Sequence, residues 1–277
     1  MEAEEQPTEQ PPILPFTQPS HPTVTDAEKA RLLLQDRIQP TTLPPELAIH
    51  IVSLGYNPWL AHRRVHEWQF QAQRHPEDID SFSVAGLYMS TARIPGGGGN
   101  KGGTRTVLPQ RIIFQTRAAD QGWATWGGEG TFGNSHTWFE ASILRPCPGP
   151  PGAEVNENKE EGGALEEALA EERWWDVRAA REALRERGWE FVEAPDGSVA
   201  WRVCNNITAR SEYRDYRVEW KRGVETEVED ERAVGKGEGF LELLEPGCCV
   251  VLWARAEEAH WCNRVMAATI EIEYKLV

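Results

Sequence analysis

Apolar residues in the first third of the chain recur every three or four positions, which is the spacing of one helix face. Leu47, Ile51 and Leu54 show this most clearly, and Gly55 closes the stretch. The pattern predicts a small helical segment over residues 25–94. Two flanking stretches complete it: one through Leu32, Leu33 and Leu34 after an N-cap at Thr25 or Asp26, and one from Pro58 that carries Trp59, Val65 and Trp68.

Beyond residue 110 the period changes to two, which is typical of strands with one buried face. Turn residues separate the apolar runs, and the strands do not alternate with long helices as they would in a doubly wound sheet. The sequence therefore predicts a mainly β fold, an antiparallel β-sandwich of the jelly-roll kind over residues 110–277. The expected strands are residues 111–117, 137–144, 189–193, 198–205, 213–220, 248–255 and 269–276.

Three segments interrupt these patterns. Residues 1–24 are rich in Pro, Gln, Glu and Thr, and they predict a disordered tail. Residues 95–109 contain a glycine run and predict a flexible linker, because a glycine stands where a phosphate-binding loop needs its lysine. Residues 147–188 predict an insertion in the sandwich, made of an acidic loop and one helix over residues 165–187 that Gly188 ends.

Composition narrows the class of protein. The 277 residues carry 29 basic and 44 acidic side chains, so the formal net charge is −15. The excess lies in residues 2–9, 154–172 and 225–238, and the balanced remainder offers no broad positive field for nucleic acid. No apolar run is long enough to span a membrane, and the acidic start is unlike a secretion signal. We expect a cytoplasmic or nuclear protein that binds neither membrane nor nucleic acid.

The five cysteines are odd in number and lack the spacing of a zinc or redox site. We therefore expect no disulfide framework, no metal and no cofactor. A hydrolase is one alternative, with His136, Glu140 or the neighbouring His260 and Cys262 as its candidate groups. Because nothing in their spacing predicts a catalytic set, no catalytic residue is assigned.

Twelve tryptophans are heavy usage for this length, and they divide by position. The four inside predicted strands, at positions 138, 201, 220 and 253, are expected to fill the core. Others lie in predicted loops beside polar residues, as in a site where a sugar or peptide stacks on an aromatic face and meets hydrogen-bonding groups. The candidate ligand-binding residues are Arg117, Asp120, Gln121, Trp123, Trp126, Trp261 and Asn263.

Three motifs of the β half are distinctive: Asp120-Gln-Gly-Trp123, Thr137-Trp-Phe-Glu140 and Leu252-Trp-Ala-Arg-Ala256. They resemble a largely uncharacterised fungal family with a tryptophan-rich, galactose-binding-like β-sandwich. The resemblance implies an intracellular sandwich, similar in outline to galactose-binding-like jelly rolls and to the sandwiches appended to plant F-box proteins, without an established activity. The chain departs from the family at Cys248, where such proteins usually place an aspartate.

The stretch Leu43-Pro-Pro-Glu-Leu47 with Ile51, and later Arg64-Val65 and Trp68, resembles an F-box. This short helical motif docks on the linker subunit of a cullin ubiquitin ligase. The resemblance implies an amphipathic helix pair that presents an apolar face to that subunit. The same side chains are equally suited to pack on the sandwich, so both interpretations stay open. The candidate partner-binding residues are Leu43, Pro44, Leu47 and Ile51.

Three functions follow from these observations. The first is a noncatalytic binding module that recognises a glycan or peptide through a tryptophan-rich loop face, and it predicts a concave aromatic surface. The alternative is a substrate adaptor of a cullin ubiquitin ligase, and it predicts that the candidate partner-binding residues are exposed. The third is a hydrolase, which requires titratable side chains to converge in a cleft.

Overall fold

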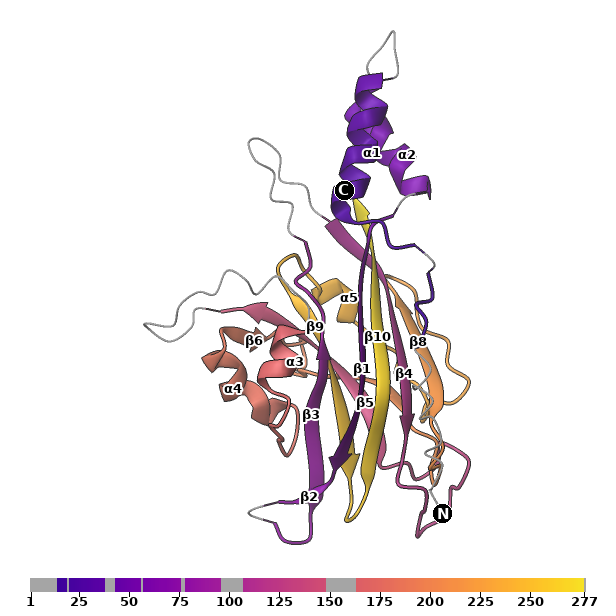
Figure 1. Cartoon of the computed structure of the whole chain (residues 1–277), viewed down its shortest axis with the longest axis vertical. Coiled ribbons are helices and arrows are strands. Elements are labelled where there is room, and N and C mark those ends of the chain that lie inside the picture. Colours follow the sequence, from indigo (N-terminus) through magenta and orange to yellow (C-terminus); the bar gives the residue numbers. More distant parts are fainter. Residues whose placement is uncertain are drawn as a thin grey trace, which may run out of the picture.

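Two antiparallel sheets form the body of the protein in this computed structural model (Figure 1). The structure describes residues 14–18, 20–37, 43–55, 57–75, 78–95, 107–147 and 163–276. The first sheet has the strand order β1-β10-β4-β8, and the second has the order β2-β3-β9-β5-β6 with β7 also paired to β5. Each of these strand pairs is antiparallel. The fold is therefore the mainly β, antiparallel sandwich that the period-two pattern predicts.

The elements run along the chain from a pair of helices into the strands, with short helices in the connections. The strands are β1 (Trp59–Gln71), β2 (Gln73–Arg74), β3 (Phe82–Ser90), β4 (Val107–Ala119), β5 (Thr137–Pro146), β6 (Trp189–Phe191), β7 (Trp201–Asn205), β8 (Arg214–Lys221), β9 (Cys249–Glu257) and β10 (Cys262–Leu276). The helices are α1 (Val24–Arg37), α2 (Pro45–Gly55), α3 (Ala164–Ala168), α4 (Arg181–Glu186) and α5 (Phe240–Leu243), and a 3₁₀ turn covers Arg178–Ala180.

Strand β9 shows how the core is divided, because its side chains alternate between the two faces of the second sheet. Val250 and Leu252 are buried in the large cluster between the sheets. Val251 and Trp253 are buried on the opposite face, in a second cluster that includes Leu184 of α4. The inserted helices therefore cover the outer face of this sheet, and β9 is apolar on both sides as a fully enclosed strand must be.

Residues 59–71 form a strand where the apolar spacing predicts a helix. β1 pairs with β10 along its length, and a register shift between Val65 and Trp68 interrupts its alternation. This bulge moves apolar side chains out of the period of two, so the local pattern imitates a helix. The predicted helical segment over residues 25–94 is wrong beyond Gly55, and the sandwich starts at residue 59 rather than at residue 110.

The N-terminal segment (residues 14–18 and 20–22) packs on the outer face of the first sheet. Leu14 is 2% exposed, and the Pro22 carbonyl accepts the Trp59 N–H at 2.7 Å. Glu271 of β10 is fully buried and accepts hydrogen bonds from this segment. The predicted disordered tail is therefore wrong for these residues, because composition cannot reveal an anchor in a distant strand. Residues 1–13 lie outside the part that the structure describes.

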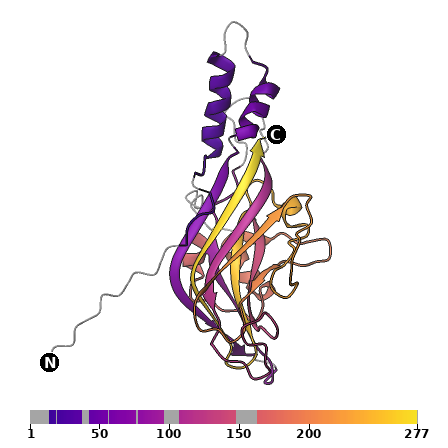
Figure 2. The ribbon, with the colours of Figure 1, turned by 90° about the vertical axis from the view of Figure 1, so that its right-hand side faces the viewer.

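Helices α1 and α2 pack as a hairpin that extends beyond one end of the sandwich (Figures 1 and 2). Asp26 and Thr23 cap α1 reciprocally: Thr23 Oγ1 accepts the Asp26 N–H at 3.1 Å, and Asp26 Oδ2 accepts the Thr23 N–H at 3.0 Å. The helix therefore begins at Val24, slightly ahead of the predicted N-cap. Helix α2 ends at Gly55 as the apolar spacing predicts.

The insertion is not the single helix predicted over residues 165–187. Between α3 and the 3₁₀ turn, Trp174 leaves the helical path because its backbone exchanges two hydrogen bonds with Ala85 of β3, at 2.7 and 3.0 Å. The glycine run at 96–106 and most of the acidic loop, 148–162, lie outside the described residues. Among the helices of the described residues, none is long and apolar enough to cross a membrane.

Candidate functional site

The loop between β4 and β5, residues 120–136, carries most of the predicted ligand-binding residues; we call it the tryptophan loop. Asp120 is fully buried and holds its base. The carboxylate accepts the Gly122 N–H at 2.7 Å and the Ala209 N–H at 2.6 Å, and the Asp120 N–H donates to the Arg210 carbonyl. Burial raises the pKa of Asp120, and these backbone hydrogen bonds oppose the rise. Asp120 is thus a structural anchor of the loop, without access to a ligand.

Trp123 and Trp126 are the outward-facing members of the tryptophan loop, with 47% and 83% of their surface exposed. Their backbone is held in place from both sides. Gln121 Nε2 donates to the Trp123 carbonyl at 2.8 Å, and Asn134 Nδ2 donates to the Trp126 carbonyl at 3.0 Å. Neither indole N–H has a hydrogen-bond partner within the described ranges. The loop therefore presents two large aromatic rings from a backbone fixed by hydrogen bonds.

Trp261 and Asn263 lie behind the tryptophan loop, inside the fold. Trp261 is 6% exposed and packs edge-on against His136 at 4.8 Å. Asn263 is fully buried; its amide donates to the carbonyls of Trp138 and Arg255. Both residues serve the core, so the prediction that they face a ligand is wrong. A local pattern of aromatic and amide residues cannot distinguish a buried hydrogen-bond network from an open site.

Arg117 also departs from the predicted site, because it points across the first sheet. Its guanidinium donates two hydrogen bonds of 2.6 Å to the Asp215 carboxylate of β8. These hydrogen bonds to the Asp215 carboxylate raise the pKa of Arg117 above its ordinary value. Of the seven candidate ligand-binding residues, four thus lie in the tryptophan loop: Asp120 as its buried anchor, with Gln121, Trp123 and Trp126.

The groups considered for a hydrolase are dispersed or already bound. Glu140 pairs with Arg255 at 2.8 Å on the second sheet. His136 packs against Trp261. Burial raises the pKa of the Cys262 thiol, which disfavours the thiolate that a nucleophile requires. Within the described ranges, no group of three His, Cys, Asp or Glu side chains is placed to hold a metal ion.

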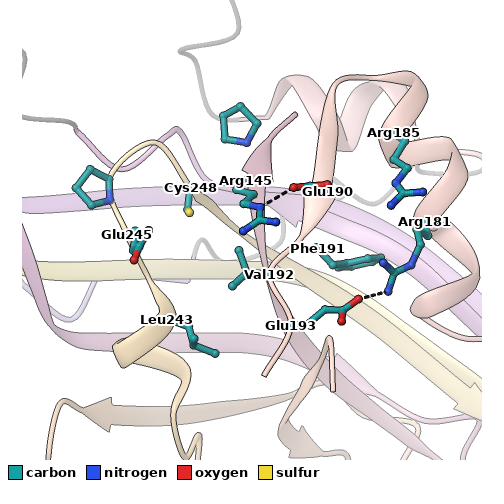
Figure 3. A pocket seen from close by; sticks show the side chains of 12 residues that line it. Arg145, Arg181, Arg185, Glu190, Phe191, Val192, Glu193, Leu243, Glu245 and Cys248 are labelled. Atoms are coloured by element: carbon teal, nitrogen blue, oxygen red, sulfur yellow. Dashed lines mark hydrogen bonds and ion pairs between the residues drawn. The ribbon is translucent and has the colours of Figure 1, made fainter. Parts of the chain in front are cut away.

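Figure 3 shows a cleft between β6, α4 and the turn before β9. Its volume is about 650 Å³. Its charged residues form ion pairs across its wall: Arg145 with Glu190 at 2.6 Å, and Arg181 with Glu193 at 2.7 Å. Arg185 and Glu245 complete a balanced set of three arginines and three glutamates. Because the two signs are equal in number and two of the arginines are already paired, the cleft favours neither an anionic nor a cationic ligand.

The helical hairpin leaves one apolar stripe uncovered on α2. Leu47, Ile51 and Leu54 are 50%, 44% and 75% exposed, whereas Ala48 and Val52 on the same helix are buried. Pro44 is also exposed, and Leu43 is half-buried. The exposure that the adaptor hypothesis predicts is therefore confirmed for Pro44, Leu47 and Ile51.

The later part of the F-box-like pattern does not form helix. Arg64, Val65 and Trp68 lie in β1 and pair with β10 of the sandwich. The resemblance at residues 43–68 thus corresponds to helix only as far as Gly55. Any docking surface of this kind consists of α1 and α2 alone.

A groove of about 510 Å³ runs beside β8, the last strand of the first sheet; we call it the edge groove. From the sequence, its acidic wall is predicted to be a solvated loop between strands. No local pattern shows which strand edge such a loop faces. The residues that line it are Phe132, Cys204, Asp215, Tyr216, Arg217, Val218, Glu219, Thr226, Glu227, Val228, Glu229, Asp230, Ala233 and Val234.

The chain matches no protein-family model, and no curated protein is significantly similar to it in sequence. The geometry of the described residues is therefore the basis for a functional proposal. It places two exposed apolar surfaces far apart on the sandwich: the tryptophan loop after β4, and the α2 stripe on the hairpin beyond the opposite end (Figure 1).

Proposed function

We propose that the protein is a noncatalytic binding module that recognises a peptide segment through the tryptophan loop. The observation that carries this proposal is the exposure of Trp123 and Trp126 on a loop anchored by the buried Asp120. Tryptophans are enriched among the residues that dominate binding energy at protein interfaces. A fixed backbone lowers the entropy that is lost when the rings are covered.

A peptide fits this loop better than a glycan does. Sugar recognition needs polar groups beside the aromatic face to bind the hydroxyls. Here Asp120 and Asn263 are buried, and Gln121 uses both ends of its amide inside the fold: Nε2 on the Trp123 carbonyl and Oε1 on the Cys262 N–H at 3.3 Å. None of these three predicted polar partners is therefore free to bind sugar hydroxyls. The two exposed rings, whose indole N–H groups have no partner among the described residues, suit an apolar or aromatic side chain of a peptide.

The test is selection of a displayed library of random twelve-residue peptides on the full-length protein, with a glycan array in parallel. We expect enriched peptides whose affinity falls at least about tenfold when Trp126 is changed to Ala, and further with Trp123→Ala. Ile79→Ala is the matched control, because Ile79 is also an exposed apolar residue, at 67%, in a different loop. Equal affinity of all three variants would refute the proposal, as would enrichment of glycans alone.

A second function is favoured by the exposed stripe on α2. We propose that the hairpin docks on another protein, so that the chain joins a client at the tryptophan loop to a partner at Leu47, Ile51 and Leu54. Helices commonly bind partners through apolar residues at such spacings of four and three. The F-box-like pattern at its start makes the linker subunit of a cullin ubiquitin ligase the partner to test first.

Point substitutions are the appropriate test of docking, because removal of the first 100 residues would take β1 and β3 out of the sandwich. We expect purified linker subunit to bind the full-length chain and to lose binding to Leu47→Glu/Ile51→Glu. His50→Glu adds a negative charge at another exposed position of α2 and should leave binding unchanged. Absence of binding by the unmodified protein would rule out this partner and leave the peptide-binding proposal untouched.

A further inference from the structure

Strand β8 has a free edge, and the edge groove lies along it. β8 is the terminal strand of the first sheet and pairs with β4 on one side. Over residues 215–219, the backbone hydrogen bonds of the described structure join β8 to β4 alone. Half of the N–H and C=O groups in such a strand point away from the sheet, which is the arrangement that accepts an added strand.

The lining of the groove is acidic on both sides, because Asp215 and Glu219 belong to β8 itself and the other acids to the segment opposite. Five acids and one base line the space: Asp215, Glu219, Glu227, Glu229 and Asp230 against Arg217. Some of this charge is already neutralised, since Asp215 pairs with Arg117, Glu219 with Arg217 at 2.6 Å, and Asp230 with Arg232 at 3.0 Å.

Glu227 and Glu229 are different, because both are exposed and neither has a partner among the described residues. They lie three and five positions beyond Val224, which closes the turn after β8, on the segment that faces the strand edge. Two unpaired carboxylates beside open backbone groups favour a positively charged occupant. A second copy of this chain would bring the same acids against each other, so self-association through this edge is disfavoured.

One end of the edge groove belongs to the tryptophan loop. Phe132 of that loop lines the groove and meets Tyr216 of β8 edge-to-face, with ring centroids 6.5 Å apart. The Tyr216 hydroxyl accepts the Ile207 N–H at 2.9 Å, and burial raises the pKa of this phenol to about 12, so the ring is a fixed, neutral part of the wall. A chain held by the tryptophan loop can therefore continue directly along β8.

We propose that the edge groove binds a basic peptide as an added strand on β8. This inference rests on the proposed function and names its ligand class: an extended peptide with Lys or Arg at alternate positions, next to the residue that contacts the tryptophan loop. Five consecutive residues of β8 line the groove, so about five peptide residues pair with the edge. Backbone hydrogen bonds supply the general affinity, and the acidic wall selects for positive charge.

The experiment uses the peptides enriched from the random twelve-residue library on the full-length protein. Synthetic copies are measured by fluorescence anisotropy against Glu227→Lys/Glu229→Lys and against a matched control, Glu182→Lys/Glu186→Lys. The control reverses two exposed charges on α4 and so produces the same change in net charge away from the groove. A copy of each peptide with alternate backbone nitrogens methylated removes the donors that strand addition needs.

We expect the enriched peptides to carry alternating basic residues and to lose at least about tenfold in affinity with Glu227→Lys/Glu229→Lys, but little with the control. Backbone methylation and added salt should weaken binding as well. Peptides that depend on Trp126 but tolerate the groove variant would overturn the edge-groove inference and leave the proposed function standing. Peptides that lose affinity with Glu227→Lys/Glu229→Lys but tolerate Trp123→Ala and Trp126→Ala would overturn the proposed function and leave the edge groove as a binding site. Failure to enrich any peptide would overturn both proposals. A dimer that dissociates in Glu227→Lys/Glu229→Lys would overturn the edge-groove inference alone.

Discussion

Glu271 provides the sharpest test of how this fold is assembled. Its side chain lies on the outer face of the first sheet, is fully buried, and accepts three hydrogen bonds from the N-terminal segment. These come from the Thr17 N–H at 2.8 Å, the Gln18 N–H at 3.2 Å and His21 Nε2 at 3.0 Å. The change Glu271→Gln keeps the shape of the side chain and removes its charge. It should release the segment while the sandwich stays folded.

The magnitude follows from the number of donors. A hydrogen bond to a charged acceptor contributes roughly 1 kcal/mol more than one to a neutral acceptor. Three such bonds give about 3 kcal/mol for the docking of the segment on β10, and every 1.4 kcal/mol is a factor of ten in population. The undocked form should therefore become more populated by about a hundredfold. Global stability should change less, because the core between the sheets is not altered.

Hydrogen exchange resolves this prediction segment by segment. Amides of Thr17 and Gln18 should exchange about a hundredfold faster in Glu271→Gln, while those of β4 and β10 keep their protection. Glu273→Gln is the matched control: Glu273 lies two residues further on the same face but pairs with Arg111 at 2.8 Å. Unchanged exchange at Thr17 in Glu271→Gln would refute the idea that the carboxylate anchors the segment.

The same carboxylate predicts a pH dependence. Burial alone would raise the pKa of Glu271, but the hydrogen bonds from Thr17, His21 and Gln18 outweigh it and lower the pKa below its ordinary value. A lowered pKa in the folded state means that its stabilisation is complete above the ordinary glutamate pKa of about 4.3 and is lost as the pH falls through the folded-state pKa. After correction for intrinsic rates, protection of Thr17 should decline over that acidic range, and Glu271→Gln should abolish the decline.

Two further substitutions test packing. Asp120→Ala leaves two backbone N–H groups without their acceptor, so the free energy of unfolding measured in urea should fall by about 2–4 kcal/mol. A decrease of less than about 1 kcal/mol would contradict the anchoring role. Gly86→Ala places a methyl group 2.2 Å from the Phe70 ring, so the free energy of unfolding should fall by about 1–3 kcal/mol. Gly55→Ala is the control, since a methyl group there meets nothing within 4 Å, and it should be neutral or slightly stabilising.

The sequence by itself determined the features that depend on local alternation. Strands β4 to β9 fall where the period-two runs predict them, as does β10 from residue 269 on, and helix α2 follows its apolar spacing to Gly55. The first part of β10, residues 262–268, lies where the sequence predicts a loop. Trp138, Trp220 and Trp253 are buried as their positions inside strands predict. These predictions succeed because the side chains on one face of a strand or helix repeat along the chain itself.

The tertiary structure decided whatever depends on a partner far away in the chain. β1 is a strand because β10 pairs with it, and the N-terminal segment is ordered because Glu271 accepts its N–H groups. The candidate site divides for the same reason. The sequence predicts that both Trp126 and Asn263 lie in loops and face a ligand. In the structure Trp126 is 83% exposed, whereas Asn263 is enclosed by carbonyls of two strands. Burial and hydrogen-bond partners are properties of the assembled sheets, so no local pattern contains them.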